Sequence, residues 1–84
     1  TELQLNKNFQ IQPHRDKGNV GESYIIGFGD YGNGQLKVEN ELIDIKDKFY
    51  KFDGTNKTHS TLPFKGNRYS IVYFNNSVSF NDKL

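Results

Sequence analysis

RYSIVYF, at residues 68–74, is the stretch that decides the fold class of this chain. It is filled with β-branched and aromatic residues, which fit the half-buried pleated surface of a sheet. ESYIIGF at residues 22–28 has the same character, and residues 1–6 alternate Leu3 and Leu5 with polar side chains at the period of a half-buried strand. These segments predict an all-β chain in which the two leucines face the core.

Short turns separate the other predicted strands. Clusters rich in glycine, asparagine and aspartate predict turns at residues 17–21, 30–34, 53–57 and 65–67. Between them, short strands are expected at residues 35–38, 42–45, 49–52, 59–63 and 77–80, and residues 9–16 are expected to be extended. About eight short strands without a helical period are typical of an all-β sandwich or barrel.

The composition narrows the class of protein. The 84 residues fit one domain, residues 1–84, and because the chain starts at Thr1 without a methionine we interpret it as a piece truncated at its N-terminus. The absence of cysteine removes disulfides, thiolate zinc sites and cysteine nucleophiles. A formal net charge of +1 gives no strong attraction to nucleic acid. No apolar run approaches the roughly 20 residues that span a bilayer and no signal-peptide pattern is evident, so we expect an intracellular location, cytoplasmic or nuclear, and no membrane partner.

Both histidines of the chain fall in positions that suit a metal site. His14-Arg15-Asp16 is an H-x-D triplet at the end of the extended segment, where His14 and Asp16 share one face because side chains alternate along a strand. Pro13 favours this extended geometry. His59 follows far downstream, where the chain can return from an opposite sheet. Two histidines and one carboxylate on one face of a metal form the facial triad of non-haem Fe(II) oxygenases.

Three further side chains are candidates for holding an acidic co-substrate. Arg68 opens the strongest predicted strand, and its planar guanidinium can bind a carboxylate through two parallel hydrogen bonds. Ser70 shares its face and can add a hydroxyl donor. Tyr24 either packs in the core with Ile26 and Phe28 or offers its hydroxyl to the same carboxylate.

Other polar residues have a plainer interpretation. Asn6 and Asn8 are expected to form a turn at a strand end, and Asn19 is expected to shape the turn after the H-x-D triplet. Arg15 and Lys17 are expected on a solvated face, from which Arg15 can reach a phosphate.

The order of these motifs resembles a known enzyme superfamily. HRDKGN at residues 14–19, a glycine-containing turn before Leu36, and THSTLPFKGNRYSIVYF at residues 58–74 are similar to the Fe(II)- and 2-oxoglutarate-dependent dioxygenases. The resemblance implies a double-stranded β-helix, the jelly roll also found in cupins. One departure is Asn33-Gly34-Gln35, because family members often carry Gly-Gly before that leucine.

The resemblance also assigns roles to the residues singled out above. It implies that Fe(II) is held by His14, Asp16 and His59, and that 2-oxoglutarate binds this iron while Arg68 and Ser70 anchor its far carboxylate. O₂ would be the oxidant of a substrate C–H bond.

Among the branches of the superfamily, the chain looks most like the TET/JBP group. The form H-x-x-x-P-x-x-G-x-R-Y-S at residues 59–70 and the HRDKGN string carry this similarity. It implies a methylated pyrimidine base in DNA or RNA as the substrate, flipped out of any duplex to reach the iron. AlkB-like demethylases share R-x-S and stay an alternative, as does a hydroxylase of proteins or small molecules. Prolyl hydroxylases usually have lysine where Arg68 stands.

Two interpretations from other classes stay open. A cupin-like binding module would hold a metal or ligand in the same jelly roll without turnover. A purely structural β-sandwich would leave the imidazoles of His14 and His59 far apart, since a shared ion needs ligand nitrogens about 2 Å from the metal.

Overall fold

The computed structural model describes residues 1–75, and within this range the regular structure consists of strands alone. The strands of this range are β1 (Glu2–Lys7), β2 (Ser23–Phe28), β3 (Tyr31–Asn33), β4 (Leu36–Val38), β5 (Glu41–Ile43), β6 (Tyr50–Phe52), β7 (His59–Thr61), β8 (Phe64–Gly66) and β9 (Tyr69–Phe74). Every pair of these strands is antiparallel. The prediction of an all-β chain is confirmed. The described residues include no helix of the length and apolarity that a membrane crossing needs.

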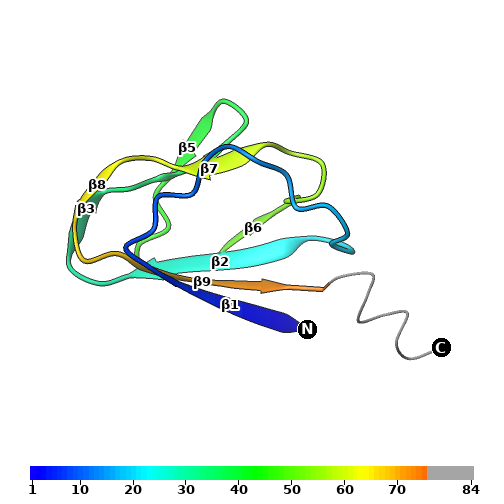
Figure 1. Cartoon of the computed structure of the whole chain (residues 1–84), viewed down its shortest axis with the longest axis horizontal. Coiled ribbons are helices and arrows are strands. Elements are labelled where there is room, and N and C mark those ends of the chain that lie inside the picture. Colours follow the sequence, from blue (N-terminus) through cyan, green and yellow to red (C-terminus); the bar gives the residue numbers. More distant parts are fainter. Residues whose placement is uncertain (76–84) are drawn as a thin grey trace.

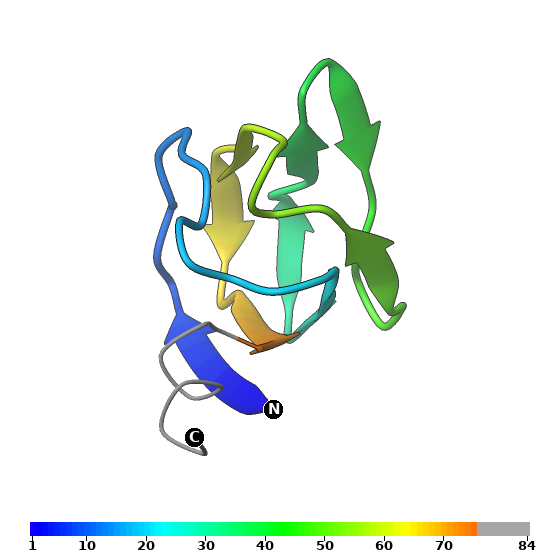
Figure 2. The same cartoon turned by 90° about the vertical axis from the view of Figure 1, so that its right-hand side faces the viewer.

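The strands form three sheets (Figure 1). A four-stranded sheet has the order β1-β9-β2-β6, and a three-stranded sheet has the order β5-β4-β7. β3 and β8 pair separately at one end of the molecule. The segment between β1 and β2 leaves the four-stranded sheet, runs beside β7 and then returns, and Figure 2 shows the returning part crossing the molecule before β2 begins.

The hydrophobic core lies between the two larger sheets. Ile25 of β2 and Phe52 of β6 pack with Leu36 and Val38 of β4, and Ile45 joins them from the loop after β5. Each of these side chains is at most 5% exposed. Full burial of one such side chain contributes about 1.5–3 kcal/mol, so this small cluster supplies much of the stability. Two antiparallel sheets packed face to face are consistent with a β-sandwich.

The prediction that Leu3 and Leu5 face the core is wrong. Leu3 is 57% exposed and Leu5 is 59% exposed, whereas Asn6 is buried at 8%. β1 is an edge strand, and its register with β9 sets Asn6 opposite Ser70 on the inner face. At this edge the inner face borders a cavity that Gln4, Asn6 and Ser70 help to line, so β1 turns these polar side chains toward it.

The prediction that Tyr24 packs in the core is also wrong, whereas its contact with an acid stays a prediction. Tyr24 is 46% exposed on the outer face of β2, while its neighbours Ser23 and Ile25 are buried. Gly27 continues the inner face, where an added Cβ would lie 2.7 Å from the Tyr31 hydroxyl. Ser23, Ile25 and Gly27 therefore form the inner face of β2, where only Gly27 fits against Tyr31, and the alternation of the strand turns Tyr24 outward.

Two predicted turns are strands in the structure. Residues 30–34 contain β3 and residues 65–67 overlap β8, and these two strands pair with each other. Gly66 has a φ of 97°, and a Cβ there would collide with the backbone of Asp30 and Tyr31. Only glycine combines this φ with so close an approach of two strands.

The remaining predictions differ from the structure mainly at element ends. Strands β4, β5, β6 and β7 occur within one or two residues of their predicted positions. Residues 9–16 form no continuous strand and pair only through an isolated bridge at His14. The predicted strand at residues 77–80 lies outside the described residues.

Candidate metal centre

The backbones of His14 and His59 bring the two imidazoles together. The His14 amide donates to the His59 carbonyl over 3.0 Å, and the His59 amide donates to the His14 carbonyl over 2.9 Å. His59 is the first residue of β7, which is an edge strand of the three-stranded sheet. The segment that carries His14 is therefore hydrogen-bonded to this edge at His14 itself. The ring centroids lie 4.3 Å apart. The interpretation as a structural sandwich with distant histidines is therefore wrong.

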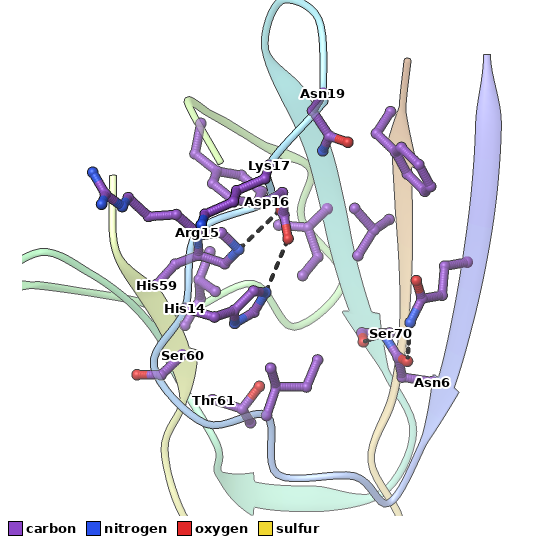
Figure 3. A pocket seen from close by; sticks show the side chains of 17 residues that line it. Asn6, His14, Arg15, Asp16, Lys17, Asn19, His59, Ser60, Thr61 and Ser70 are labelled. Carbon is purple, nitrogen blue, oxygen red and sulfur yellow. Dashed lines mark hydrogen bonds and ion pairs between the residues drawn. The ribbon is translucent and has the colours of Figure 1, made fainter. Parts of the chain in front are cut away.

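The Asp16 carboxylate lies between the two imidazoles (Figure 3). Its Oδ1 is 2.9 Å from Nε2 of His14, and its Oδ2 is 3.1 Å from Nε2 of His59. The Asp16 amide donates to the Gly54 carbonyl over 2.7 Å, which fixes the backbone from which the side chain starts. One ligand atom from each of His14, Asp16 and His59 can be chosen so that all lie within 4.8 Å of one another. The three residues predicted to bind metal are thus brought to one point.

Hydrogen bonds at the far side of each ring turn Nε2 toward Asp16. Nδ1 of His14 lies 2.9 Å from the Gln12 carbonyl, and Nδ1 of His59 lies 2.9 Å from the Lys57 carbonyl. Because a carbonyl oxygen only accepts, Nδ1 carries the proton, and Nε2 of a neutral ring carries a lone pair. Histidines that bind metals commonly donate their other ring N–H to a carbonyl in this way.

This pattern requires positive charge between Asp16 and the histidines. In neutral rings the bare Nε2 atoms of His14 and His59 would face carboxylate oxygens that also carry only lone pairs. The repulsion is relieved when the imidazoles take up second protons, or when one divalent cation lies among the three ligands. Metal ions and protons therefore compete for this position.

The pKa values of the buried members follow from the same contacts. Burial acts to lower the pKa of His59, but the hydrogen bonds to Asp16 and to the Lys57 carbonyl, with the Asp16 charge, raise it above its ordinary value. Burial acts to raise the pKa of Asp16, but the hydrogen bonds and charges of His59 and His14 bring it below its ordinary value. Each partner thus favours the charged form of the other.

The three candidate ligands line a cavity of about 370 Å³ between the two larger sheets. Pockets that hold small molecules commonly measure about 300–1,000 Å³. Asn6 and Ser70 lie across this cavity from the histidines in Figure 3, and Asn6 Nδ2 donates to Ser70 Oγ over 3.4 Å. The Ser70 hydroxyl keeps its own proton for another acceptor. Asn6 therefore belongs to the cavity wall and not to the predicted turn, whereas Asn8 does form a turn after β1 with a φ of 51°.

Arg68 points inward, as predicted, but it is not among the residues that line this cavity. The side chain is only 2% exposed, and its Nε donates to the Gly34 carbonyl over 3.0 Å. Its Nη2 has no hydrogen-bond partner among the described residues. None of the ion pairs in residues 1–75 involves Arg68, so the carboxylate partner expected for a buried guanidinium is not a residue of this range.

Two aromatic rings cover the Arg68 guanidinium. Its Cζ lies 5.5 Å from the centroid of Tyr31 and 5.8 Å from that of Phe64. Burial lowers the pKa of Arg68 and Tyr31 opposes part of this effect, yet a guanidinium stays charged in proteins. Sequence reasoning misses Tyr31 because it assigns residues 30–34 to a turn, and the three residues of β3 carry no alternation that could have identified it.

Positive side chains stand at the outer part of the cavity. Arg15 and Lys17 contribute to its lining and are exposed, and Arg15 projects away from the triad in Figure 3. Asn19 shapes the turn after Asp16, as predicted, since its amide donates to the Asp16 carbonyl over 3.4 Å, and it also lines the cavity.

Comparison with protein-family models, curated proteins and solved structures gives no match to this chain. The chemistry of the side chains described above is therefore the basis for inferring a function.

Proposed function

We propose that this chain is an intracellular Fe(II)- and 2-oxoglutarate-dependent dioxygenase whose two packed sheets belong to a double-stranded β-helix. The observation that carries the proposal is the convergence of His14, Asp16 and His59 beside a cavity of about 370 Å³. When bound, iron would supply O₂ activation, coupling the decarboxylation of 2-oxoglutarate to succinate and CO₂ with insertion of one oxygen atom into a substrate C–H bond.

The donor set fits a catalytic metal. Two imidazole nitrogens and one carboxylate oxygen are the ligands of the facial triad, which leaves the opposite positions of the metal open. The carbonyls of Gln12 and Lys57 hold the imidazoles with Nε2 available, so the chain itself sets the tautomer that a metal needs. Asp16 stays ionised because its pKa is lowered.

The buried guanidinium supports binding of an acid. Arg68 Nη2 is an orphaned donor on a side chain that is 2% exposed, and a carboxylate would satisfy it together with the charge. Ser70, two residues along β9, is buried and has a free hydroxyl proton for the same acid. Because Arg68 does not line the cavity, the proposal requires the cavity to reach this residue when the acid binds.

For the substrate we propose a methylated pyrimidine base in nucleic acid. The similarity of the HRDKGN and RYS motifs to the TET/JBP group motivates this choice. Arg15 and Lys17 at the cavity rim support it, since exposed cations are the usual contacts to phosphates. A base held in a duplex would have to be flipped into the cavity.

The decisive measurement is succinate and CO₂ release by the chain with Fe(II), 2-oxoglutarate and O₂. We expect turnover by the wild-type chain and by Asp30→Asn, a control that changes an exposed carboxylate. We expect none above background for His14→Ala or Asp16→Ala. Full turnover by either of these variants would remove the proposal.

The substrate is tested by mass spectrometry of the products. Hydroxymethylated pyrimidine on a methylated oligonucleotide supports the proposed substrate, with the unmethylated oligonucleotide as control. Complete loss of the methyl group would indicate an AlkB-like demethylase. Product on a peptide or a metabolite alone would exclude a nucleic-acid substrate.

A metal-binding module of the cupin type is the second candidate. The observation that favours it is that Arg68 stands apart from the cavity that the candidate ligands line. This candidate predicts metal binding by His14, Asp16 and His59 without succinate release, so the same assay separates the two functions.

A further inference from the structure

The loop at residues 53–57 contacts both segments that carry the candidate ligands. The Gly54 carbonyl accepts the Asp16 amide over 2.7 Å. The Lys57 carbonyl accepts Nδ1 of His59 over 2.9 Å. Thr55 Oγ1 donates to the Asn19 carbonyl over 3.1 Å, which ties down the turn that follows Asp16. This loop of five residues therefore forms hydrogen bonds with two of the three candidate ligands, Asp16 and His59.

Within this loop, Gly54 stands against the carboxylate itself. A Cβ added at this position would lie 2.7 Å from Asp16 Oδ2, 3.1 Å from Phe52 Cε2 and 3.4 Å from His59 Cε1. Gly54 is not among the residues of the chain with positive φ, so the backbone here is one that alanine can adopt. Glycine at position 54 is thus explained by the limited space for a side chain and not by the backbone conformation.

We propose that Gly54 is a positioning residue of the metal centre: its lack of a side chain leaves the room in which the Asp16 carboxylate stands between the two imidazoles. This inference rests on the proposed metal-binding function and adds a residue outside the ligand set. It names the contact through which the residue acts, the one between position 54 and Asp16 Oδ2.

We expect a methyl group at position 54 to disturb the ligand geometry more than the fold, although the Phe52 ring, with Cε2 3.1 Å from the added Cβ, must also shift slightly. The closest atom, Asp16 Oδ2, is the free end of a side chain that is 26% exposed and can rotate away. Rotation moves Oδ2 from His59, where it now lies 3.1 Å from Nε2. Replacement of residues that orient a metal ligand typically weakens metal binding about 10–100-fold, and we expect a loss in this range.

The test is a titration of the full chain with Co(II), followed through the visible spectrum of the bound ion. The wild-type chain is compared with Gly54→Ala and with Gly32→Ala, a matched control on β3 where an added Cβ meets no atom within 4 Å. Thermal unfolding of each chain without metal is measured in parallel. We expect Gly54→Ala to fold, to bind Co(II) about 10–100-fold more weakly and to show a changed spectrum, while Gly32→Ala matches the wild type.

Each other outcome contradicts a defined step. Equal Co(II) affinity of Gly54→Ala and the wild type would overturn the inference and leave the proposed function in place. Loss of folded structure in Gly54→Ala would overturn it too, because the glycine would then serve packing. A wild-type chain that binds no Co(II) would overturn the proposed function itself.

Discussion

The Arg68 guanidinium donates to the Gly34 carbonyl and interacts with the Tyr31 hydroxyl, yet its Nη2 has no partner in a buried position. A buried donor without a partner costs about 1–3 kcal/mol. This cost offsets part of the stability that the other contacts of the Arg68 side chain provide. Its position under Tyr31 and Phe64 is nevertheless well defined. A residue with these properties is better explained by a ligand than by packing.

Arg68→Met tests this explanation. Methionine removes the charge and the orphaned donor, but it also leaves the Gly34 carbonyl without its donor. Because these effects oppose each other, we expect the free energy of unfolding to stay within about 1 kcal/mol of the wild-type value. Calorimetric titration of 2-oxoglutarate into the Co(II)-loaded chain should show no binding. Lys65→Met, which removes an exposed cation on β8, should change neither quantity.

Two results would count against this role of Arg68. A loss of more than about 2 kcal/mol of stability would mark the arginine as a structural residue. Unchanged affinity for 2-oxoglutarate would separate it from the acid site.

The shifted pKa values of His59 and Asp16 predict how the stability of the metal-free chain depends on pH. The pKa of His59 is raised, so its contribution is complete below about pH 6.5, the value in the unfolded chain, and is lost as the pH rises through the folded value. The pKa of Asp16 is lowered, so its contribution is present above about pH 3.8 and is lost as the pH falls through the folded value. Thermal unfolding in chelator should therefore show lower stability at about pH 8 than at about pH 6.

Metal should reverse this trend. Its ligands must be deprotonated, so the increase in unfolding temperature caused by Co(II) should be larger at about pH 8 than at about pH 6. Asp16→Asn is the control, because it removes the carboxylate charge. In this variant, the part of the pH dependence of stability that comes from the pair of Asp16 and His59 should disappear. A metal effect that is the same at both pH values would contradict competition between the ion and the protons of the histidines.

At the scale of single residues, the sequence predicts the convergence of the candidate ligands better than the position of the candidate acid site. His14 and Asp16 are close in the chain, and alternation along an extended backbone predicts that they share one face, although the structure pairs this segment only at His14. Tyr24 and Tyr31 both lie in β-rich segments, and only the packing around Gly27 decides that Tyr31 faces inward and Tyr24 outward. Such a choice depends on contacts between distant segments, which local patterns do not contain.

For whole strands, the outer face of the four-stranded sheet shows why the sequence pattern does not predict which face of a strand is buried. Leu3, Tyr73 and Tyr24 lie side by side across β1, β9 and β2, and all three belong to the face away from the core. β2 and β9 therefore carry apolar residues on both faces, and β1 carries its two leucines on the outer face alone. Alternation predicts that these segments are strands, but it does not identify the buried face.

A pair of substitutions checks the assigned faces. Leu5→Ala on the outer face of β1 should change the free energy of unfolding by about 0.5 kcal/mol or less, because the side chain is 59% exposed. Ile25→Ala on the inner face of β2 should cost about 2–5 kcal/mol, because it leaves a cavity in the core. Urea unfolding measures both changes. A larger loss for Leu5 than for Ile25 would invert the proposed orientation of the sheet.

For the molecule as a whole, metal binding should couple to stability. The ligands come from the segment between β1 and β2 and from β7, so an ion bound in the folded chain joins parts that separate on unfolding. At a free Co(II) concentration 100 times its Kd, the gain is about 2.7 kcal/mol. For a domain of this size, that corresponds to a rise of about 10–20 °C in Tm.

Differential scanning calorimetry with and without Co(II) measures this rise, and chelator should abolish it. His59→Ala should keep its metal-free transition but lose the response to the ion. A wild-type Tm that is unaffected by saturating Co(II) would contradict a centre shared by these segments.

The arrangement of the sheets could be predicted only in outline. Short strands between turns predict an all-β sandwich or barrel, of which the all-β class is confirmed and a β-sandwich is consistent with the structure. The order β1-β9-β2-β6 joins the first strand to the last described one, and β3 and β8 pair across residues expected to be turns. Pairings between distant segments depend on which register buries the core, which composition and spacing do not specify.

The paired amides of His14 and His59 have a consequence for how the centre opens. Because each N–H is held by the carbonyl of the other residue, neither segment can detach without freeing both. In deuterated solvent the two amide hydrogens should then show the same protection factor, because one opening exposes both. That factor would give the fraction of time for which the unliganded centre is open in the intact chain.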